Sequence, residues 1–366
     1  MEKKFSVKKL SPYAKNSAIS YGIVIAGFIA ATLMSQAGLL SSSLQGQLVP
    51  ICAYIVMAVS LNLVVGISGE LSIGHAGFMS IGAFSGILCA DLMEGMVASD
   101  AVRLTCGIIT GGVVAGLAGL LIGIPVLRLR GDYLAIVTLA FGEIIKNLMN
   151  IIYVAQDSKG IHVSTHGDLE LEEGARIMLN GPMGAVGVQR ISTFTAGIIL
   201  VLFTLFVVQN LINSRQGRAI MACRDNRIAA ESIGLNVMQY KLLAFTVSAV
   251  LAGMGGALFG LNFSSLLPIK FNFNTSVLIL VFVVLGGIGN IWGSVISAAV
   301  LTVLPEMLRQ FSDYRMLVYA IVLILVMIFT YNPVLRSYRE MIIDKIKAAF
   351  SRKPKEPAAV EGGASE

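Results

Sequence analysis

The residues that could do chemistry in this chain are a few charged and polar side chains within long apolar segments. In YLAIVTLAFGEIIKNLMNIIYV, residues 133–154, Glu143 is followed by Lys146 and Asn147. These spacings put all three on one helix face, where carboxylate and ammonium can partly neutralise each other. Such groups usually face a bundle interior or a water-filled path. Two interpretations stay open: a substrate pathway, or a structural pair near the outer interface.

A second polar group lies in GISGELSIGHAGF, residues 66–78, where Glu70, Ser72 and His75 interrupt a glycine-rich stretch. Another glycine cluster, LGGIGNIWG, follows a later apolar segment and contains Gly286, Gly287 and Gly289. Broken helices at membrane depth are tolerated where they are buried or line a cavity, and they often frame transport sites. We therefore predict a pathway role for both clusters. Glycines that only pack helices together, and a buried packing histidine, are the alternatives.

The third feature is a charged stretch, SRQGRAIMACRDNRIAAESIGLNVMQYKLLAF, residues 214–245. Asp225 or Asn226 can cap the start of a short helix, and Gly234 suits the position just after its end. Within that helix Ile228, Ala229 and Ile233 would form a small apolar side, with Arg227 and Glu231 elsewhere. Local helix physics alone favours a plain connector between two apolar segments.

The elements that must position these residues are membrane-spanning helices. The 366 residues are 56% hydrophobic and only 13% charged, whereas a soluble domain carries roughly 25% charged residues. No charged residue occurs between Lys15 and Glu70, which leaves room for two crossings of about 20 residues each. The net charge of +6 is small, and we do not expect a nucleic-acid surface. The composition predicts an integral α-helical membrane protein.

The predicted fold is all-α: a polytopic transmembrane bundle of about 8–10 helices, some broken, with a short cytoplasmic helix. Thirty residues would be long for one crossing, so the glycines of the last long segment are expected to divide it into two short helices. The apolar segments lie near 17–40, 48–66, 76–93, 104–127, 133–154, 191–213, 242–262, 275–304 and 317–333.

Charge bias gives an expected orientation. Cytoplasmic loops retain Lys and Arg, and most of the 27 such residues fall inside if both termini are cytoplasmic. The domains are then a cytoplasmic arm 1–16, a permease-like membrane domain 17–333 and a cytoplasmic tail 334–366 with a disordered end. Loop 155–190 would be exterior and solvated, with contact to an external partner as an alternative. Loop 214–241 would be cytoplasmic.

Motifs for catalysis, nucleotide binding and metal binding are missing from the sequence. It contains neither G-x-x-x-x-G-K-[ST] nor H-E-x-x-H, and its four cysteines form no C-x-x-C. His162 and His166 are closely spaced but lack a third ligand. We therefore expect no metal site, no cofactor in this chain and no enzymatic activity, and energy for any transport would come from another chain.

Several motifs resemble those of a known family. The spacing Ala229-Ala230-x-x-x-Gly234 is similar to the EAA…G coupling loop of ABC-importer permeases, with Ile228 in place of the leading glutamate. Its flanks, together with the stretches at 66–84, 128–144 and 286–309, resemble the branched-chain amino acid ABC permease family of the LivM type, in that family's order. Ser297 stands where the family has a glycine.

The resemblance implies a bacterial inner-membrane permease subunit that moves branched-chain amino acids inward. Its partners would be a second, similar permease or a second copy of itself, two cytoplasmic ATPase subunits that bind ATP-Mg, and a periplasmic or lipid-anchored binding protein. Related permeases carry urea or short-chain amides, and a stand-alone secondary transporter or channel is a rival from another class. The residues implied in ATPase coupling are Arg224, Asp225, Arg227, Ile228, Ala229, Ala230, Glu231 and Gly234.

Overall fold

The computed structural model describes most of the chain, apart from parts of both termini and a few short stretches. By contacts the chain divides into two units, Met1–Arg309 and Gln310–Glu366, and the second contributes one described helix, α12 (Arg315–Tyr331). The membrane domain expected over 17–333 therefore extends across both units. Most of the expected N-terminal arm and the whole tail 334–366 lie outside the described residues, which are 12–38, 41–97, 99–129, 131–157, 160–165, 176–308 and 314–331.

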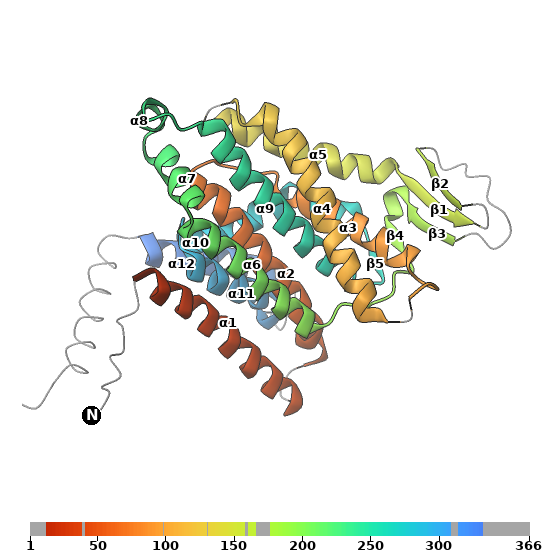
Figure 1. The fold of residues 1–366 in the computed structure, drawn as a ribbon. Coiled ribbons are helices and arrows are strands. Elements are labelled where there is room, and N and C mark those ends of the chain that lie inside the picture. Colours follow the sequence, from red (N-terminus) through yellow and green to blue (C-terminus); the bar gives the residue numbers. More distant parts are fainter. Residues whose placement is uncertain are drawn as a thin grey trace, which may run out of the picture. The chain divides into compact units, whose positions relative to one another are not determined.

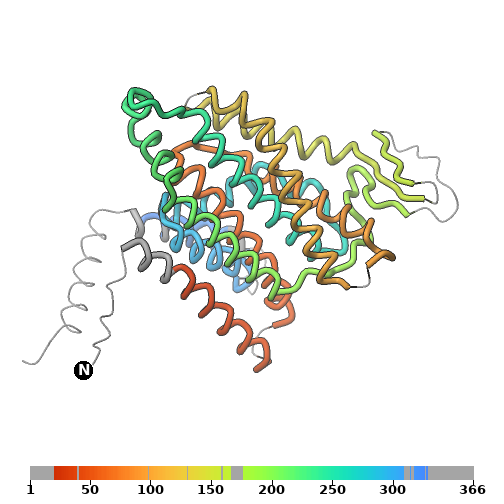
Figure 2. Tube along the Cα trace, viewed as in Figure 1, coloured from red at the N-terminus to blue at the C-terminus, as the bar shows by residue number. Residues whose placement is uncertain are grey.

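The first unit is a bundle of long apolar helices (Figures 1 and 2). Within the described residues, six helical stretches are long and apolar enough to cross a membrane, the first being α2 together with the π-helix η1. The predicted polytopic helical bundle is confirmed. The helices are α1 (Pro12–Gln36), α2 (Ser42–Asn62), η1 (Leu63–Ser68), α3 (His75–Leu92), α4 (Asp100–Val126), α5 (Asp132–Ile151), α6 (Phe194–Asn213), α9 (Val237–Gly260), α10 (Phe273–Gly286) and α11 (Ile291–Met307).

Small residues hold the centre of the bundle together. The helices α3, α4 and α9 approach so closely that a Cβ on Gly82 would overlap the backbone of Gly253, and one on Gly253 would overlap Gly111. Membrane helices gain packing contacts when small residues let their backbones approach. The glycine-rich stretch 111–119 is therefore a packing surface of α4.

The long segment 275–304 is divided at its glycines, as predicted. Helix α10 ends at Gly286 and α11 begins at Ile291, and between them Gly287 and Gly289 have φ of 92° and 82°. L-residues with a side chain rarely adopt such angles. The two helices come together where Gly286 meets the backbone of Gly293, which leaves no room for a Cβ on either residue.

The segment expected as a loop over 155–190 instead contributes most of a small antiparallel sheet. Helix α5 ends at Ile151, and the strands β1 to β5 run in the order β2-β1-β3-β4-β5, with 3-10 turns at Gly181–Met183 and Pro268–Phe271. Within this expected exterior loop, β1 pairs locally with β2 and β3, whereas β5 comes from beyond α9 and its pairing is non-local. The strands are β1 (Tyr153–Asp157), β2 (Gly160–Ser164), β3 (Arg176–Asn180), β4 (Ala185–Val186) and β5 (Ser265–Leu266).

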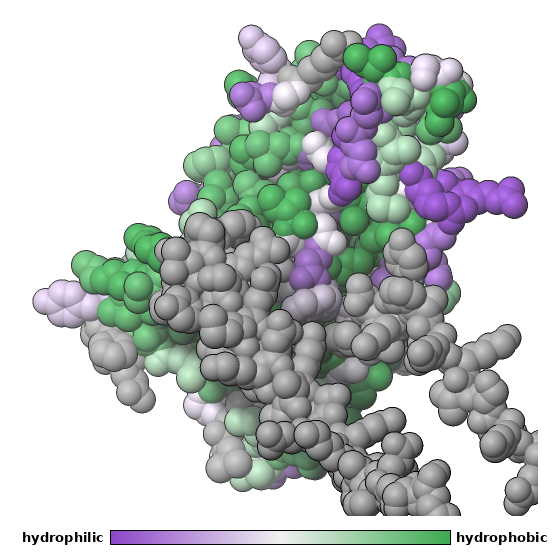
Figure 3. Space-filling model, turned by 90° about the vertical axis from the view of Figure 1, so that its left-hand side faces the viewer, coloured by the Kyte–Doolittle hydropathy of each residue, from purple (hydrophilic) through white to green (hydrophobic). Residues whose placement is uncertain are grey.

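The sheet and the charged stretch lie at opposite ends of the bundle. Helices α7 (Arg215–Asp225) and α8 (Arg227–Ser232) extend beyond the ends of α6 and α9, far from the strands (Figure 1). Seen from the side that carries α7 and α8, hydrophilic side chains gather next to hydrophobic ones on the upper part of the surface (Figure 3). The two segments expected on opposite sides of the membrane are thus separated by the length of the bundle.

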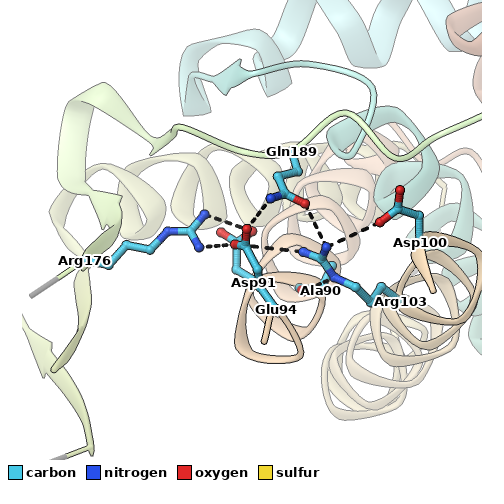
Figure 4. A network of polar contacts seen from close by, with 7 residues as sticks. All are labelled: Ala90, Asp91, Glu94, Asp100, Arg103, Arg176 and Gln189. Carbon is cyan, nitrogen blue, oxygen red and sulfur yellow. Dashed lines mark hydrogen bonds and ion pairs between the residues drawn. The ribbon is translucent and has the colours of Figure 1, made fainter. Parts of the chain in front are cut away.

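A buried arginine joins the sheet to the helices (Figure 4). Arg103 of α4 is 4% exposed, and it donates from Nε to the Ala90 carbonyl at 3.1 Å and from Nη1 to Gln189 Oε1 at 2.7 Å. The carboxylate of Glu94 lies between Arg103 and Arg176 of β3 and contacts both. The α3–α4 turn, the sheet and the segment before α6 are therefore held in one polar network.

Replacing Arg103 tests this network. The change Arg103→Met removes the donors to the Ala90 carbonyl and to Gln189 Oε1. Because buried acceptors are left unpaired, we expect a loss of about 1–3 kcal/mol in the free energy of unfolding. Thermal denaturation of the purified protein measures it. The control is Arg190→Met, because Arg190 is exposed and donates to Ser264 only among the described residues. Equal stability of the two variants would contradict a structural role for the network.

Candidate functional site: the coupling segment and two helix breaks

The charged stretch forms two short helices with a sharp turn between them. Asn226 Oδ1 accepts a hydrogen bond from the Ala229 amide at 3.0 Å, and so caps α8. Gly234, with φ of 85°, follows the end of the helix. Of the two predicted caps, Asn226 is confirmed, and the glycine stop is confirmed as well.

Two isoleucines project from α8. Ile228 is 80% exposed and Ile233 is 74% exposed, although both are large and apolar. On another side of the helix, Arg227 and Glu231 form an ion pair at 2.8 Å. Large exposed side chains rimmed by charge are typical of a protein-binding surface. Ala229 is exposed too, so the predicted apolar side of the helix faces outward.

The inner side of α8 is held by a small separate core. Ala230 is 2% exposed and packs with Cys223 and Val237, while Leu235 and Tyr240 cover the cluster. Burial raises the pKa of the Cys223 thiol, which disfavours the reactive thiolate. Cys223 is therefore a packing residue, and α8 is anchored to α7 and α9 through Ala230.

The charged groups on either side of α8 reach the first glycine cluster. Arg224 donates from Nη1 to the Gly66 carbonyl at 2.8 Å and also bonds Asp225. Lys241, at the start of α9, forms an ion pair with Glu70, and both side chains are largely buried. Glu70 was predicted to border a pathway. In the structure its carboxylate contacts Lys241, which belongs to the charged stretch 214–245.

The first glycine cluster is a true helix break. Helix α2 passes into the π-helix η1, which ends at Gly69 with φ of 75°, and α3 begins at His75. Insertions of this kind are frequent at functional sites. Gly69 has no room for a Cβ because the Arg224 side chain lies against it.

The two glycine clusters meet each other. A Cβ on Gly66 would overlap the backbone of Gly289, so the backbones of the two segments are in direct contact. Asn62, buried at the end of α2, bridges the junction. Its Oδ1 accepts from the Gly289 amide at 2.8 Å, and its Nδ2 donates to Ser294 Oγ at 2.9 Å. Asn62 was not among the residues predicted from the sequence. A single amide at the end of a largely apolar helix does not indicate which groups it will bind.

The polar residues of the first cluster are closed off in this conformation. Ser72 and His75 are each 2% exposed. His75 Nε2 lies 2.8 Å from Ser60 Oγ, and the Ser72 hydroxyl is buried without a partner among the described residues. The arrangement of His75 fits the packing alternative, whereas Ser72 has an unused hydrogen-bonding group.

The predicted pair on α5 is present. Glu143 and Lys146 form an ion pair, and Glu143 Oε1 also accepts from the Phe273 amide at 3.2 Å, at the start of α10. Asn147 is exposed. Helix α5 is the least buried of the six candidate spans in the described residues, with 28% of its apolar window buried. A charged pair is therefore carried on a largely uncovered helix.

Comparison with known proteins identifies the family. Residues 43–327 match the model described as branched-chain amino acid transport system / permease component. The chain belongs to this family. The described part of the chain contains no group of three or more His, Cys, Asp or Glu that could hold a metal ion.

Individual relatives agree with the family. This member is 37% identical over 286 residues to the high-affinity branched-chain amino acid transport system permease protein LivM of Salmonella typhimurium, and 36% identical over 290 residues to LivM of Escherichia coli. Each alignment covers 75% of this chain and 66% of the relative, just under two thirds. LivH of Salmonella typhimurium is 30% identical over 140 residues, which cover 38% of this chain and 43% of LivH. No solved structure is a significant match.

The Asn62 bridge gives a prediction for this family member. Asn62→Leu leaves the Gly289 amide without its acceptor, whereas the Ser294 hydroxyl keeps its bond to the Asn290 carbonyl. We therefore expect a loss of about 1–3 kcal/mol in unfolding free energy, measured by thermal denaturation. The control is Asn262→Leu, because in the described part of the chain Asn262 bonds through its backbone amide, to the Phe259 carbonyl at 3.2 Å. Equal melting temperatures for the two variants would show that the Asn62 side chain does not hold the two helix breaks together.

Proposed function

We propose that this chain is the permease subunit of an ATP-driven importer that moves branched-chain amino acids inward across a bacterial inner membrane. Two ATPase subunits would bind ATP-Mg at the cytoplasmic end, a second, homologous permease would complete the pore, and a binding protein would deliver substrate at the sheet end. The family and the printed names of the LivM relatives support the substrate class.

The observation that carries the proposal is the exposed pair of isoleucines on α8. Large apolar side chains at the polar end of a membrane protein are costly unless another protein covers them. The ion pair of Arg227 with Glu231 gives this surface a polar rim. An ATPase cleft of complementary shape would bury Ile228 and Ile233 and take hold of α8.

Movement of α8 would then be passed to the helix breaks. Ala230 fixes α8 to α7, and Arg224 of α7 holds the Gly66 carbonyl. Gly66 touches Gly289, so a shift of α7 displaces both breaks together. Gly286 and Gly293 let α10 slide on α11 without side chains between them. Closure of the ATPases would in this way switch the bundle between outward- and inward-facing states.

The substrate pathway would follow the uncovered side of α5. Charged groups at membrane depth are costly, and Glu143 and Lys146 remain 35% and 19% exposed on a helix that the chain itself covers poorly. A second permease placed against α5 would enclose them in a water-filled path. Because Glu143 also accepts from the Phe273 amide, movement of α10 would alter this path.

The role of α8 is tested by adding a charge to it. Ile228→Asp places a carboxylate in the apolar contact, and we expect uptake and substrate-stimulated ATP hydrolysis to fall at least about tenfold, as for an interface hot spot. Gly234→Val should act similarly, because a β-branched residue is strained at φ of 85°. Gln239→Asp, an exposed position on α9, is the control. Coupled uptake at the control level in both α8 variants would remove the assignment.

The pathway is tested by labelling. In a variant whose four native cysteines are replaced by alanine, Asn147→Cys should react with a water-soluble maleimide in the assembled importer, because the path is wet. Leu121→Cys on α4, a position 72% exposed and expected to face lipid, is the matched control and should stay unreactive. An unreactive thiol at 147 would place α5 against lipid and contradict the path.

The function as a whole is tested in vesicles that contain the assembled complex and its binding protein. We expect ATP-dependent uptake of leucine, isoleucine and valine. Uptake of urea or acetamide in place of these amino acids would change the substrate class. ATP-independent uptake by this chain alone would establish a stand-alone transporter and overturn the proposal.

A further inference from the structure

A cavity of about 470 Å³ lies where the coupling segment and both helix breaks come together. Its wall includes Arg224 of α7, Ile67 of the first break, Gly289 of the second and Gln209 of α6. This volume is within the range of small-molecule sites. The cavity lies at the end of the bundle that carries α7, because Met221 and Arg224 of α7 form part of its wall.

The polar wall can hold both ends of a zwitterion. Arg224 has five N–H groups, and its hydrogen bonds to Gly66 and Asp225 use three of them. One N–H on each terminal nitrogen is left for a carboxylate. Asp225 offsets part of the arginine charge, so a ligand that carries its own positive charge suits this site better than a simple anion or a phosphate.

Gln209 supplies the second polar group. The side chain is 6% exposed, and its Oε1 is buried with no hydrogen-bond partner among the described residues. A half-turn of the amide exchanges oxygen and nitrogen, so Gln209 can present an acceptor to the cavity. In that orientation a ligand ammonium would donate to the Gln209 oxygen at the cavity wall, and the amide nitrogen would take the buried position.

Most of the remaining wall is apolar, although Ser20, Asn213 and Asn290 also line it. Ile67, Met221, Ile288 and Trp292 line the same cavity, and Ile288 and Trp292 are 57% and 40% exposed. Aliphatic and thioether side chains pack well against a branched aliphatic group. The guanidinium of Arg224, the amide of Gln209 and the apolar side chains together match an α-amino acid with a branched apolar side chain.

We propose that this cavity is a second amino-acid site, on the side to which the importer delivers its substrate. The ligand carboxylate binds Arg224, its ammonium binds the Gln209 amide, and its side chain packs on the isoleucines. This inference rests on the proposed function and adds regulation to it. Because the ligand contacts the coupling segment and both breaks at once, it stabilises their present arrangement and slows the next cycle. Accumulated product thereby inhibits its own import.

Direct binding tests the site. The probe is radiolabelled leucine, added without binding protein to the permease complex in phosphatidylcholine nanodiscs. We expect saturable binding that Gln209→Met weakens about tenfold or more, the effect of losing one hydrogen bond to a charged group. Thr246→Val is the control, because Thr246 Oγ1 is also buried and unpaired among the described residues but lies outside this cavity. Leucine amide and N-acetyl-leucine, which lack one charge each, should compete poorly.

A second variant and a second lipid keep the test decisive. Met221→Trp should fill the cavity and also weaken binding. If phosphatidylethanolamine in the nanodiscs displaces leucine, the site takes a lipid headgroup and the proposal is wrong. Equal binding by the wild type and both cavity variants would overturn it as well, while leucine uptake in vesicles would still establish the importer. With the site intact, internal leucine should slow uptake, and Gln209→Met should relieve the inhibition.

Discussion

The contact between Gly66 and Gly289 is the constraint on which the rest of this molecule depends. Two helices are interrupted at this point, and each interruption leaves backbone groups that must find partners away from water. Asn62 accepts from one of these groups, the Gly289 amide, and its Nδ2 also donates to the side chain of Ser294. Any larger residue at position 66 would separate the two breaks. The bundle can therefore contain two interrupted helices only because they lie against each other.

Charged side chains connect this junction to the rest of the molecule. Arg224 attaches the coupling segment to the junction at the Gly66 carbonyl, and Lys241 attaches it again at Glu70. At the far end, the polar network around Arg103 ties the sheet to the helices. The middle of the bundle, between these two sets of contacts, is packed through glycines and makes close backbone contacts.

The sequence predicted the parts of this arrangement that follow from local rules. The division of the last long segment follows from its glycines, the start of α8 from a capping residue such as Asn226, and the pair of Glu143 with Lys146 from helical spacing. Long-range contacts had no such signal. Asn62 lies within a uniformly apolar helix, and β5 joins its sheet from 80 or so residues farther along the chain. The ion pair of Glu70 with Lys241 joins residues 171 positions apart and likewise had no local signal.

The central claim, that movement of α8 reaches the breaks through Arg224 and Asn62, is tested most directly by a double-mutant cycle. The measured quantity is the number of ATP molecules hydrolysed per amino acid imported by the assembled complex. Arg224→Met and Asn62→Leu should each raise this ratio about fivefold or more, the size of a typical coupling energy. If both residues lie on one route, the double variant should be no worse than the poorer single variant. Effects that multiply in the double variant would show two independent routes and contradict the account.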